Sequence, residues 1–97
     1  MAIRIVVHLQ AHPSGGNALL EALAEEVPVA RAMAGALELV VIRDLDDRDR
    51  FIVVHTWEKR ADYEAYLAFR ATQPGGGALI PLLASYEIQF GETVGTY

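Results

Sequence analysis

Apolar and polar residues alternate along the start of the chain, from Ala2 to Gln10. Every second side chain in this stretch is a large aliphatic one: Ile3, Ile5, Val7 and Leu9. Such alternation places these side chains on one face of an extended strand. Residues 37–43, 51–57 and 86–90 are further short segments rich in β-branched and aromatic residues. The pattern therefore predicts four β-strands.

Between the first two predicted strands, apolar residues recur at helical spacing instead. The residues that define this face are Leu19, Leu20, Leu23, Val27 and Ala30. We expect Asn17 to cap the helix and residues 34–36 to end it. Pro28 removes an amide donor and is expected to kink or divide the helix. The charged residues assigned to its solvent side are Glu21, Glu25, Glu26 and Arg31.

The rest of the chain predicts a second helix, two loops and a short third helix. The second helix follows Trp57 and contains Tyr63 and Tyr66. Residues 44–50 form a charged turn, because the acidic cluster lacks the glycine and distal glutamate of a calcium loop. Residues 72–77 are expected to form a loop, and residues 78–85 a short helix with proline in its first turn.

The order of predicted elements is β-α-β-β-α-(α)-β, which indicates an α+β, ferredoxin-like fold. We expect helices on one face of an antiparallel sheet, with the first and third strands parallel neighbours at its centre. Every strand also has apolar residues for the second face, so another protein surface is expected to cover it. A second copy packed sheet to sheet is the simplest partner, which predicts a homodimer that closes into an α+β barrel.

Length and composition narrow the class of protein. The chain has 97 residues, 53% of them hydrophobic, and a net charge of −5, so we expect a single domain over residues 1–97. One lysine and scattered arginines do not form the basic patch that nucleic acid requires. There is no cysteine, and the apolar run at residues 3–9 is too short for a signal or membrane segment. We predict a cytoplasmic protein.

The segment from Phe51 to Arg70 contains the strongest candidate site. A strand that carries His55 and Trp57 leads into a helix that carries Tyr63 and Tyr66. If these side chains converge, they form a small aromatic pocket with polar tips, which is typical of small-molecule sites. The alternative is that the four residues are simply part of the core.

Four sequence features occur together. A Pro/Gly turn follows the first strand, Arg-Asp-Leu-Asp-Asp occupies residues 43–47, a strand ends at Trp57-Glu58, and the next helix contains Tyr-Glu-Ala-Tyr-Leu at residues 63–67. The combination resembles the antibiotic biosynthesis monooxygenase family of small dimeric α+β barrels. The resemblance covers nearly the whole chain in element order and is most specific from Phe51 to Leu67.

This resemblance implies a monooxygenase that needs no cofactor and no metal. Its substrate would be a quinol, an anthrone or a related aromatic polyketide-like compound, which reduces O2 itself once deprotonated. The protein would bind the flat substrate, favour its ionised form and hold O2 nearby. Trp57 and Tyr63 match family positions that form the pocket walls, and Tyr63 would offer its hydroxyl to the substrate oxygen. The substrate-binding set that we predict is Trp57, Tyr66, Val53 and Arg70.

Two positions depart from the family pattern. Val53 lies where its best-described oxygenases have asparagine, and Tyr66 lies where many relatives have histidine. His55 and His8 are candidates to compensate, because a neutral histidine accepts a phenolic proton near pH 7. His55 shares a strand face with Trp57, and His8 lies on a strand predicted to be its neighbour. We therefore predict His55, Tyr63 and His8 as catalytic residues, although histidines satisfied within a dimer remain the alternative.

Other functions fit the sequence less well. A haem site needs a helical histidine over the pocket, whereas all three histidines fall on predicted strands or a turn. A zinc site would need His8 and His12 together, but four strand residues span roughly 13 Å. Two alternatives remain: a barrel that binds or isomerises an aromatic compound without using O2, and a purely structural dimer.

Overall fold

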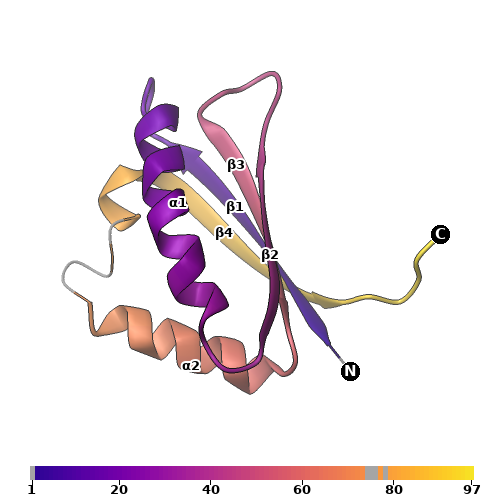
Figure 1. Ribbon diagram of the computed structural model, residues 1–97. Helices are drawn as coiled ribbons and strands as arrows, with labels where there is room; N and C mark the ends of the chain where they lie inside the picture. Colours follow the sequence, from indigo (N-terminus) through magenta and orange to yellow (C-terminus); the bar gives the residue numbers. More distant parts are fainter. Residues whose placement is uncertain (1, 74–76, 78) are drawn as a thin grey trace.

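The computed structural model describes residues 2–73, 77 and 79–97. The elements are β1 (Ile3–Ala11), α1 (Gly16–Arg31), β2 (Ala36–Arg43), β3 (Arg50–Trp57), α2 (Arg60–Ala71), the 3₁₀ helix η2 (Ile80–Leu82) and β4 (Leu83–Glu92). Their order confirms the predicted β-α-β-β-α-β fold. Both helices lie on one side of the sheet, as Figure 1 shows. No helix of the described ranges is long and apolar enough to cross a membrane.

The strands form one sheet in the order β2-β3-β1-β4, and every neighbouring pair is antiparallel. The prediction that the first and third strands are parallel is therefore wrong. The crossover through α1 makes β1 and β2 run in the same direction, and the hairpin then sends β3 back between them. Because β3 fills the gap beside β1, it lies antiparallel to both of its neighbours.

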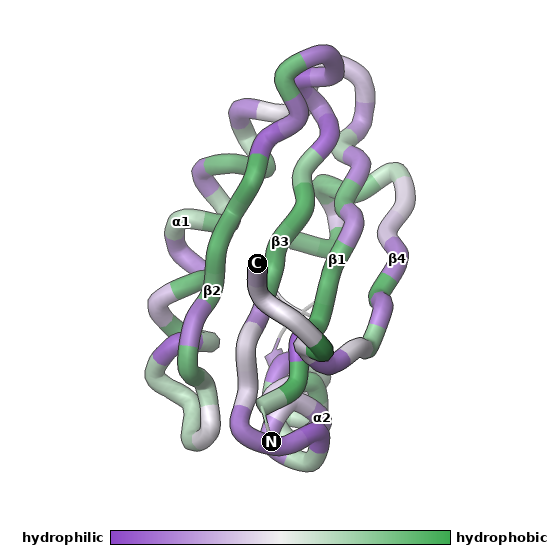
Figure 2. Tube along the Cα trace, turned by 90° about the vertical axis from the view of Figure 1, so that its right-hand side faces the viewer, coloured by the Kyte–Doolittle hydropathy of each residue, from purple (hydrophilic) through white to green (hydrophobic). Residues whose placement is uncertain are grey.

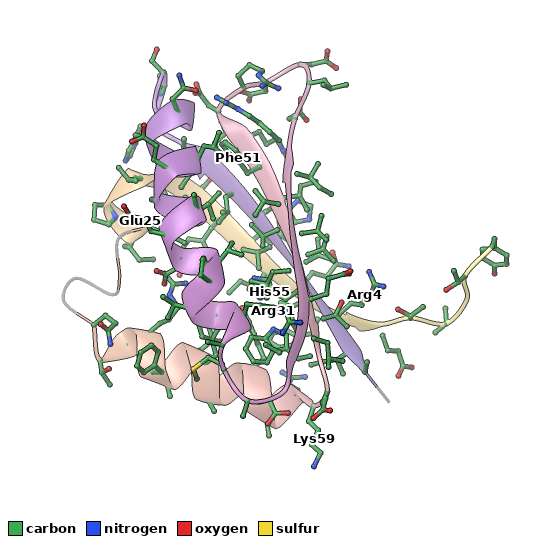
Figure 3. The ribbon with its side chains drawn as sticks, in the orientation of Figure 1. Arg4, Glu25, Arg31, Phe51, His55 and Lys59 are labelled. Carbon is green, nitrogen blue, oxygen red and sulfur yellow. The ribbon has the colours of Figure 1, made fainter. Side chains whose placement is uncertain are left out.

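The aliphatic residues that alternate along the first strand lie on one face of the sheet, in the core, as the pattern predicts. Ile5, Val7 and Leu9 are buried beneath the helices, beside Phe51 and Val53 of β3. Figure 3 shows Phe51 and His55 on the helix side of the sheet, with Lys59 pointing away from the molecule. Among the described residues, no helix covers the opposite, outer face, and Figure 2 shows that β2, β3 and β1 are largely apolar along their length.

Helix α1 differs from its prediction at both places where we expected a special residue. Pro28 does not divide it, because the helix continues to Arg31 and the Ala32 amide donates to the Pro28 carbonyl over 3.1 Å. Its N-terminus is not capped by Asn17. The carboxylate of Asp49 instead accepts hydrogen bonds from the Gly16 amide, at 2.9 Å, and from the Ser14 amide, at 3.0 Å. A residue distant in sequence thus replaces the local cap.

The charged turn between β2 and β3 is held by its own aspartates. One oxygen of Asp44 accepts the amides of Asp46 and Asp47 at 2.7 and 2.8 Å. These hydrogen bonds hold the pKa of the exposed Asp44 carboxyl below its usual value. Among the residues described, no three acidic, histidine or cysteine side chains group together as metal ligands.

The end of the chain contains more strand than its sequence predicts. The helix expected over residues 78–85 is reduced to the single turn of η2, and β4 already begins at Leu83. Leu83 pairs with Ala11 across an irregular step in the register, so sheet pairing with β1 replaces the later turns of the expected helix. Of the predicted loop over residues 72–77, residues 74–76 lie outside the described residues, as does Ala78 at the start of the predicted helix. Residues 93–97 leave the sheet as an extended arm (Figure 1).

Candidate functional site

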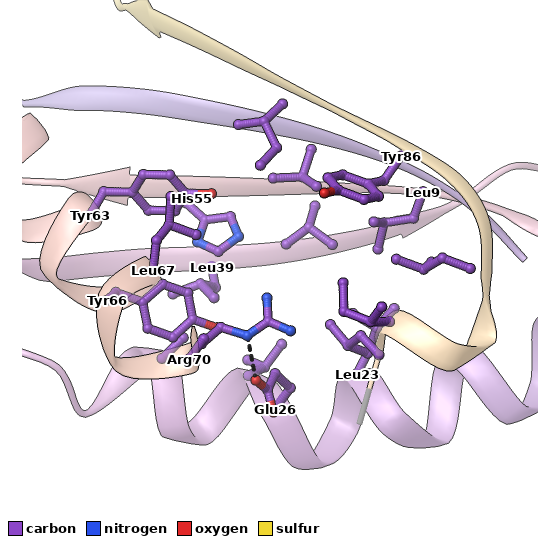
Figure 4. Close-up of a pocket in the computed structure, with 18 of the residues that line it drawn as sticks. Leu9, Leu23, Glu26, Leu39, His55, Tyr63, Tyr66, Leu67, Arg70 and Tyr86 are labelled. Carbon is purple, nitrogen blue, oxygen red and sulfur yellow. Dashed lines mark ion pairs between the residues drawn. The ribbon is translucent and has the colours of Figure 1, made fainter. Parts of the chain in front are cut away.

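A cavity of about 320 Å³ lies between the core face of the sheet and the two helices. All four strands, helices α1 and α2, and the segment around Leu79 supply its walls. Figure 4 shows that its two ends differ. Leu9, Leu23 and Tyr86 lie at one end, and the other end holds most of the polar groups, which are His55, Tyr63, Tyr66, Arg70 and Glu26.

The four aromatic residues predicted from the sequence do converge. The His55 ring lies 5.6 Å from the Tyr63 ring and 6.4 Å from the Tyr66 ring, measured between centroids. The Trp57 ring lies 5.7 Å from Tyr63 and 5.6 Å from Tyr66. The strand places His55 and Trp57 on the same face, and the helix places Tyr63 and Tyr66 three residues apart on the side that covers them.

Trp57 does not line the cavity. It is fully buried behind His55, and its indole N–H donates to His55 Nδ1 over 3.3 Å. Because Nδ1 accepts this hydrogen bond, we assign the hydrogen of the neutral imidazole to Nε2. Trp57 therefore orients His55, whereas we had predicted that it would form a wall against the substrate.

His55 is a weak base in this environment. Burial, assisted by the positive charge of Arg70, lowers the pKa of His55 from 6.5 to about 4. At neutral pH the ring is uncharged, with its acceptor nitrogen already occupied by Trp57. The geometry thus supports His55 as a hydrogen-bond donor through Nε2, in place of the proton acceptor that we predicted.

The two tyrosines of α2 are also donors. Burial, with a contribution from Tyr66, raises the pKa of Tyr63 to about 12, and burial raises the pKa of Tyr66 as well. Both hydroxyls therefore keep their protons at neutral pH. The Tyr66 hydroxyl accepts a hydrogen bond from Arg70, whose guanidinium lies 5.8 Å from the Tyr66 ring. Tyr63 and Tyr66 can each donate to an oxygen atom in the cavity.

Arg70 reaches across the cavity to the other helix. Its Nε lies 2.9 Å from Glu26 Oε1, and the two side chains are 18% and 19% exposed. Figure 4 shows the pair at the polar end, below His55 and beside Tyr66. The predicted binding residue Val53 lines the same cavity from β3. One cation and one carboxylate therefore meet where most of the uncharged donors are gathered.

His8 lies on the other face of the sheet, away from the cavity that His55 lines. In the register of β1 and β3, Ile5 pairs with His55 and His8 pairs with Ile52. His8 therefore lies on the outer face, beside a separate cavity of about 210 Å³ that Arg50 and Glu87 also line. The register therefore does not bring the predicted catalytic residue His8 beside His55, because residues an odd number of positions apart on a strand point to opposite faces.

Sequence reasoning missed Glu26 and Tyr86, which also line the cavity. The sequence pattern assigns Glu26 to the solvent side of the first helix, whereas the side chain lines the cavity. Its position follows Leu19 and Leu23 at helical spacing and precedes the buried Ala30, so it interrupts the apolar face. A carboxylate within an apolar stripe was the available signal. Tyr86 carried no comparable signal.

The sequence profile of the family described as antibiotic biosynthesis monooxygenase matches residues 2–73. A solved structure assigned to antibiotic biosynthesis monooxygenases, from Chloroflexus aurantiacus, is 26% identical, covers 100% of this chain and 97% of its own, and has a TM-score of 0.80. A Shewanella oneidensis protein is 23% identical with coverages of 92% and 87% and the same TM-score, 0.80.

A variant of SnoaB, a cofactor-independent oxygenase from Streptomyces nogalater, shares the fold at a TM-score of 0.79, with 16% identity and coverages of 98% and 95%. No curated protein is similar enough in sequence to be matched to this chain.

Proposed function

Because the chain belongs to the antibiotic biosynthesis monooxygenase family, we propose that it oxidises an electron-rich aromatic hydroxy compound with O2 and without a cofactor. A quinol, an anthrone or a related aromatic polyketide-like compound is the proposed substrate. The observation that carries the proposal is the polar end of the cavity, where His55, Tyr63 and Arg70 present hydrogen-bond donors. Such an arrangement stabilises an oxygen atom that becomes negatively charged.

The proposed reaction uses the substrate as its own reductant. Deprotonation gives an oxyanion that transfers an electron to O2, and recombination forms a carbon–oxygen bond. The resulting peroxide anion takes up the proton that the substrate lost, and the hydroperoxide so formed loses water and leaves a new carbonyl group. One oxygen atom enters the product, the other leaves as water, and the substrate supplies all the electrons. Tyr63 and His55 would hold the oxyanion, while the aliphatic end of the cavity binds the rest of the ring system.

The second candidate function is a binding or isomerising barrel that does not use O2. The observation that favours it is Val53, an apolar residue at the position where the family's best-described oxygenases have asparagine. The same aromatic compounds would then bind in the cavity without any consumption of oxygen. Oxygen uptake separates the two functions.

Tyr63→Phe tests the proposed function. We expect purified protein with a chelator present to consume O2 with a member of a panel of quinols, anthrones and naphthols, faster than the compound autoxidises. Loss of one donor to a developing oxyanion should lower kcat/KM roughly 100-fold. Tyr97→Phe is the matched control, because Tyr97 is fully exposed and lies outside the cavity. Equal rates for Tyr63→Phe and the wild type would remove Tyr63 from the reaction.

We also propose that the outer face of the sheet pairs with a second copy of the chain. Val40 and Ile42 are 41% and 46% exposed on this face, next to the half-buried Ile52 and Val54. Burying such a patch against itself stabilises a two-fold dimer. A single domain over residues 1–97 and a cytoplasmic location are the remaining parts of the proposal.

A charge placed on this face should separate the dimer. We expect light scattering to give twice the chain mass for the wild type and the chain mass for a Val40→Lys/Ile42→Lys variant. Burial of two unpaired ammonium groups in the interface causes the loss. Leu45→Lys is the control, since Leu45 is 86% exposed in the turn between β2 and β3. A monomeric wild type, or a dimeric double variant, would contradict the proposed interface.

A further inference from the structure

The proposed reaction requires a proton acceptor, and the donors that hold the oxyanion do not provide one. Tyr63 and Tyr66 keep their protons, and His55 has its acceptor nitrogen occupied by Trp57. Arg70 has no acceptor atom. Among the described residues that line the cavity, Glu26 is the only one with a carboxylate.

Glu26 is positioned to exchange a proton with a ligand held by Arg70. The 2.9 Å ion pair joins α1 to α2, and both side chains face the cavity at its polar end. The surrounding elements contribute uncharged titratable groups: His55 from β3, Tyr63 and Tyr66 from α2, and Tyr86 from β4. The net charge of this cluster is therefore zero, with one cation and one anion.

We propose that Glu26 is the general base of the reaction and that Arg70 binds the oxyanion that it creates. This inference rests on the proposed function. The proton passes from the substrate hydroxyl to the Glu26 carboxylate, so the negative charge moves from Glu26 to the substrate oxygen. The substrate O–H bond breaks, a Glu26 O–H bond forms, and no electrons are exchanged with any other group.

Proton transfer from the substrate hydroxyl to Glu26 suits a partly buried site, because it leaves the net charge of the cavity unchanged. Among the described residues that line the cavity, Glu26 is the anionic partner of Arg70 before the transfer, and the oxyanion takes that place after it. No net charge enters or leaves the cavity, so the desolvation penalty of an unpaired ion is avoided. The ligand class that follows is a flat aromatic compound with an ionisable hydroxyl group.

A phenol that is already ionised in solution should bind to this site differently from a neutral one. It brings a second negative charge to a site that holds only one cation, so it should bind only when Glu26 takes up a proton from solution. The affinity of wild-type protein for a phenolate should therefore fall about tenfold for each pH unit, because one proton is bound with the ligand. With Glu26→Gln the phenolate pairs with Arg70 directly, and its affinity should rise and become independent of pH.

The experiment combines binding and turnover. The binding probe is para-nitrophenol, whose ionised form absorbs visible light and which is not a reductant for O2. Its affinity is measured across the pH range in which it is ionised, for the wild type, Glu26→Gln, Glu26→Asp and the control Glu25→Gln. Glu25 is exposed on the outside of α1. Oxygen uptake with the substrate panel is measured on the same proteins.

We expect Glu26→Gln to lower oxygen uptake at least 100-fold, in the range typical of a lost general base, and to bind the phenolate more tightly than the wild type. Glu26→Asp should keep the pH-dependent affinity, and Glu25→Gln should match the wild type. If the Glu26–Arg70 ion pair serves only to join the two helices, Glu26→Gln should bind the phenolate more weakly than the wild type. The sign of the change in affinity therefore separates a general base from a structural ion pair.

Four results would overturn the inference. They are an unchanged rate of oxygen uptake in Glu26→Gln, weaker phenolate binding in Glu26→Gln than in the wild type, a phenolate affinity of the wild type that does not vary with pH, and no binding of the probe. If Glu26→Gln does not fold, calorimetry in two buffers measures how many protons the wild type takes up when it binds the phenolate. One proton supports the inference, and none overturns it. If no panel compound causes oxygen uptake, the oxygenase proposal fails, while the binding data still test the charge exchange.

Discussion

Replacing Trp57 with alanine is expected to lower the free energy of unfolding by roughly 3–5 kcal/mol, the cost typical of a large-to-small change in a core. Trp57 is fully buried and packs against both Tyr63 and Tyr66. Its removal leaves a void beneath the cavity wall and takes away the donor to His55. Urea denaturation, followed by circular dichroism, measures the change.

Two variants control this result. Phe69→Ala removes an aromatic ring that is 40% exposed on α2, and should cost much less than Trp57→Ala. Trp57→Phe keeps most of the packing and removes only the indole donor, so it should separate the effect on His55 from the effect on stability. A cost below about 1 kcal/mol for Trp57→Ala would show that the ring is not a core residue.

The second large effect is a loss of stability in acid that arises from His55. Its pKa is about 4 in the folded protein and 6.5 in its ordinary state, so the unfolded chain binds more protons between these values. Stability should rise with pH through this window and reach its full value above pH 6.5. A difference of this size corresponds to about 3 kcal/mol.

The test compares how unfolding free energy depends on pH in the wild type and in His55→Asn. The variant should lose less stability than the wild type between neutral pH and pH 4, whatever its stability at pH 7. His12→Gln is the matched control, because His12 is exposed and should leave the pH dependence unchanged. Parallel curves for the wild type and His55→Asn would show that His55 is not held neutral by burial.

Periodicity predicted the strands and the core face well. Ile5, Val7 and Leu9 alternate with more polar residues, so the buried side of β1 could be read directly. Alternation alone does not give the direction of β3 relative to β1, because both directions satisfy the same pattern. The direction follows from the order of the elements: the helical crossover makes β1 and β2 run in the same direction, and the hairpin makes β3 antiparallel to both.

The site was predicted in part. His55, Trp57, Tyr63 and Tyr66 meet because strand and helix periods bring them together. Which of these residues line the cavity and which support them from behind depends on how deeply each one packs. The spacing of residues in the sequence does not give that depth. Both faces of β3 are apolar, so the sequence did not show which of them continues the core face of β1. It therefore did not show that His8 and His55 lie on opposite faces of the sheet. The contribution of Glu26 was missed because an acidic residue in a helix is usually exposed.

The most direct test of the whole account is turnover of an anthrone or quinol under isotopically labelled O2, with a chelator present. The account predicts a rate above autoxidation and a product that carries one labelled oxygen atom, with the second atom released as water. Bound compound that is returned unoxidised, or consumption of O2 that leaves no label in the product, would contradict the monooxygenase function.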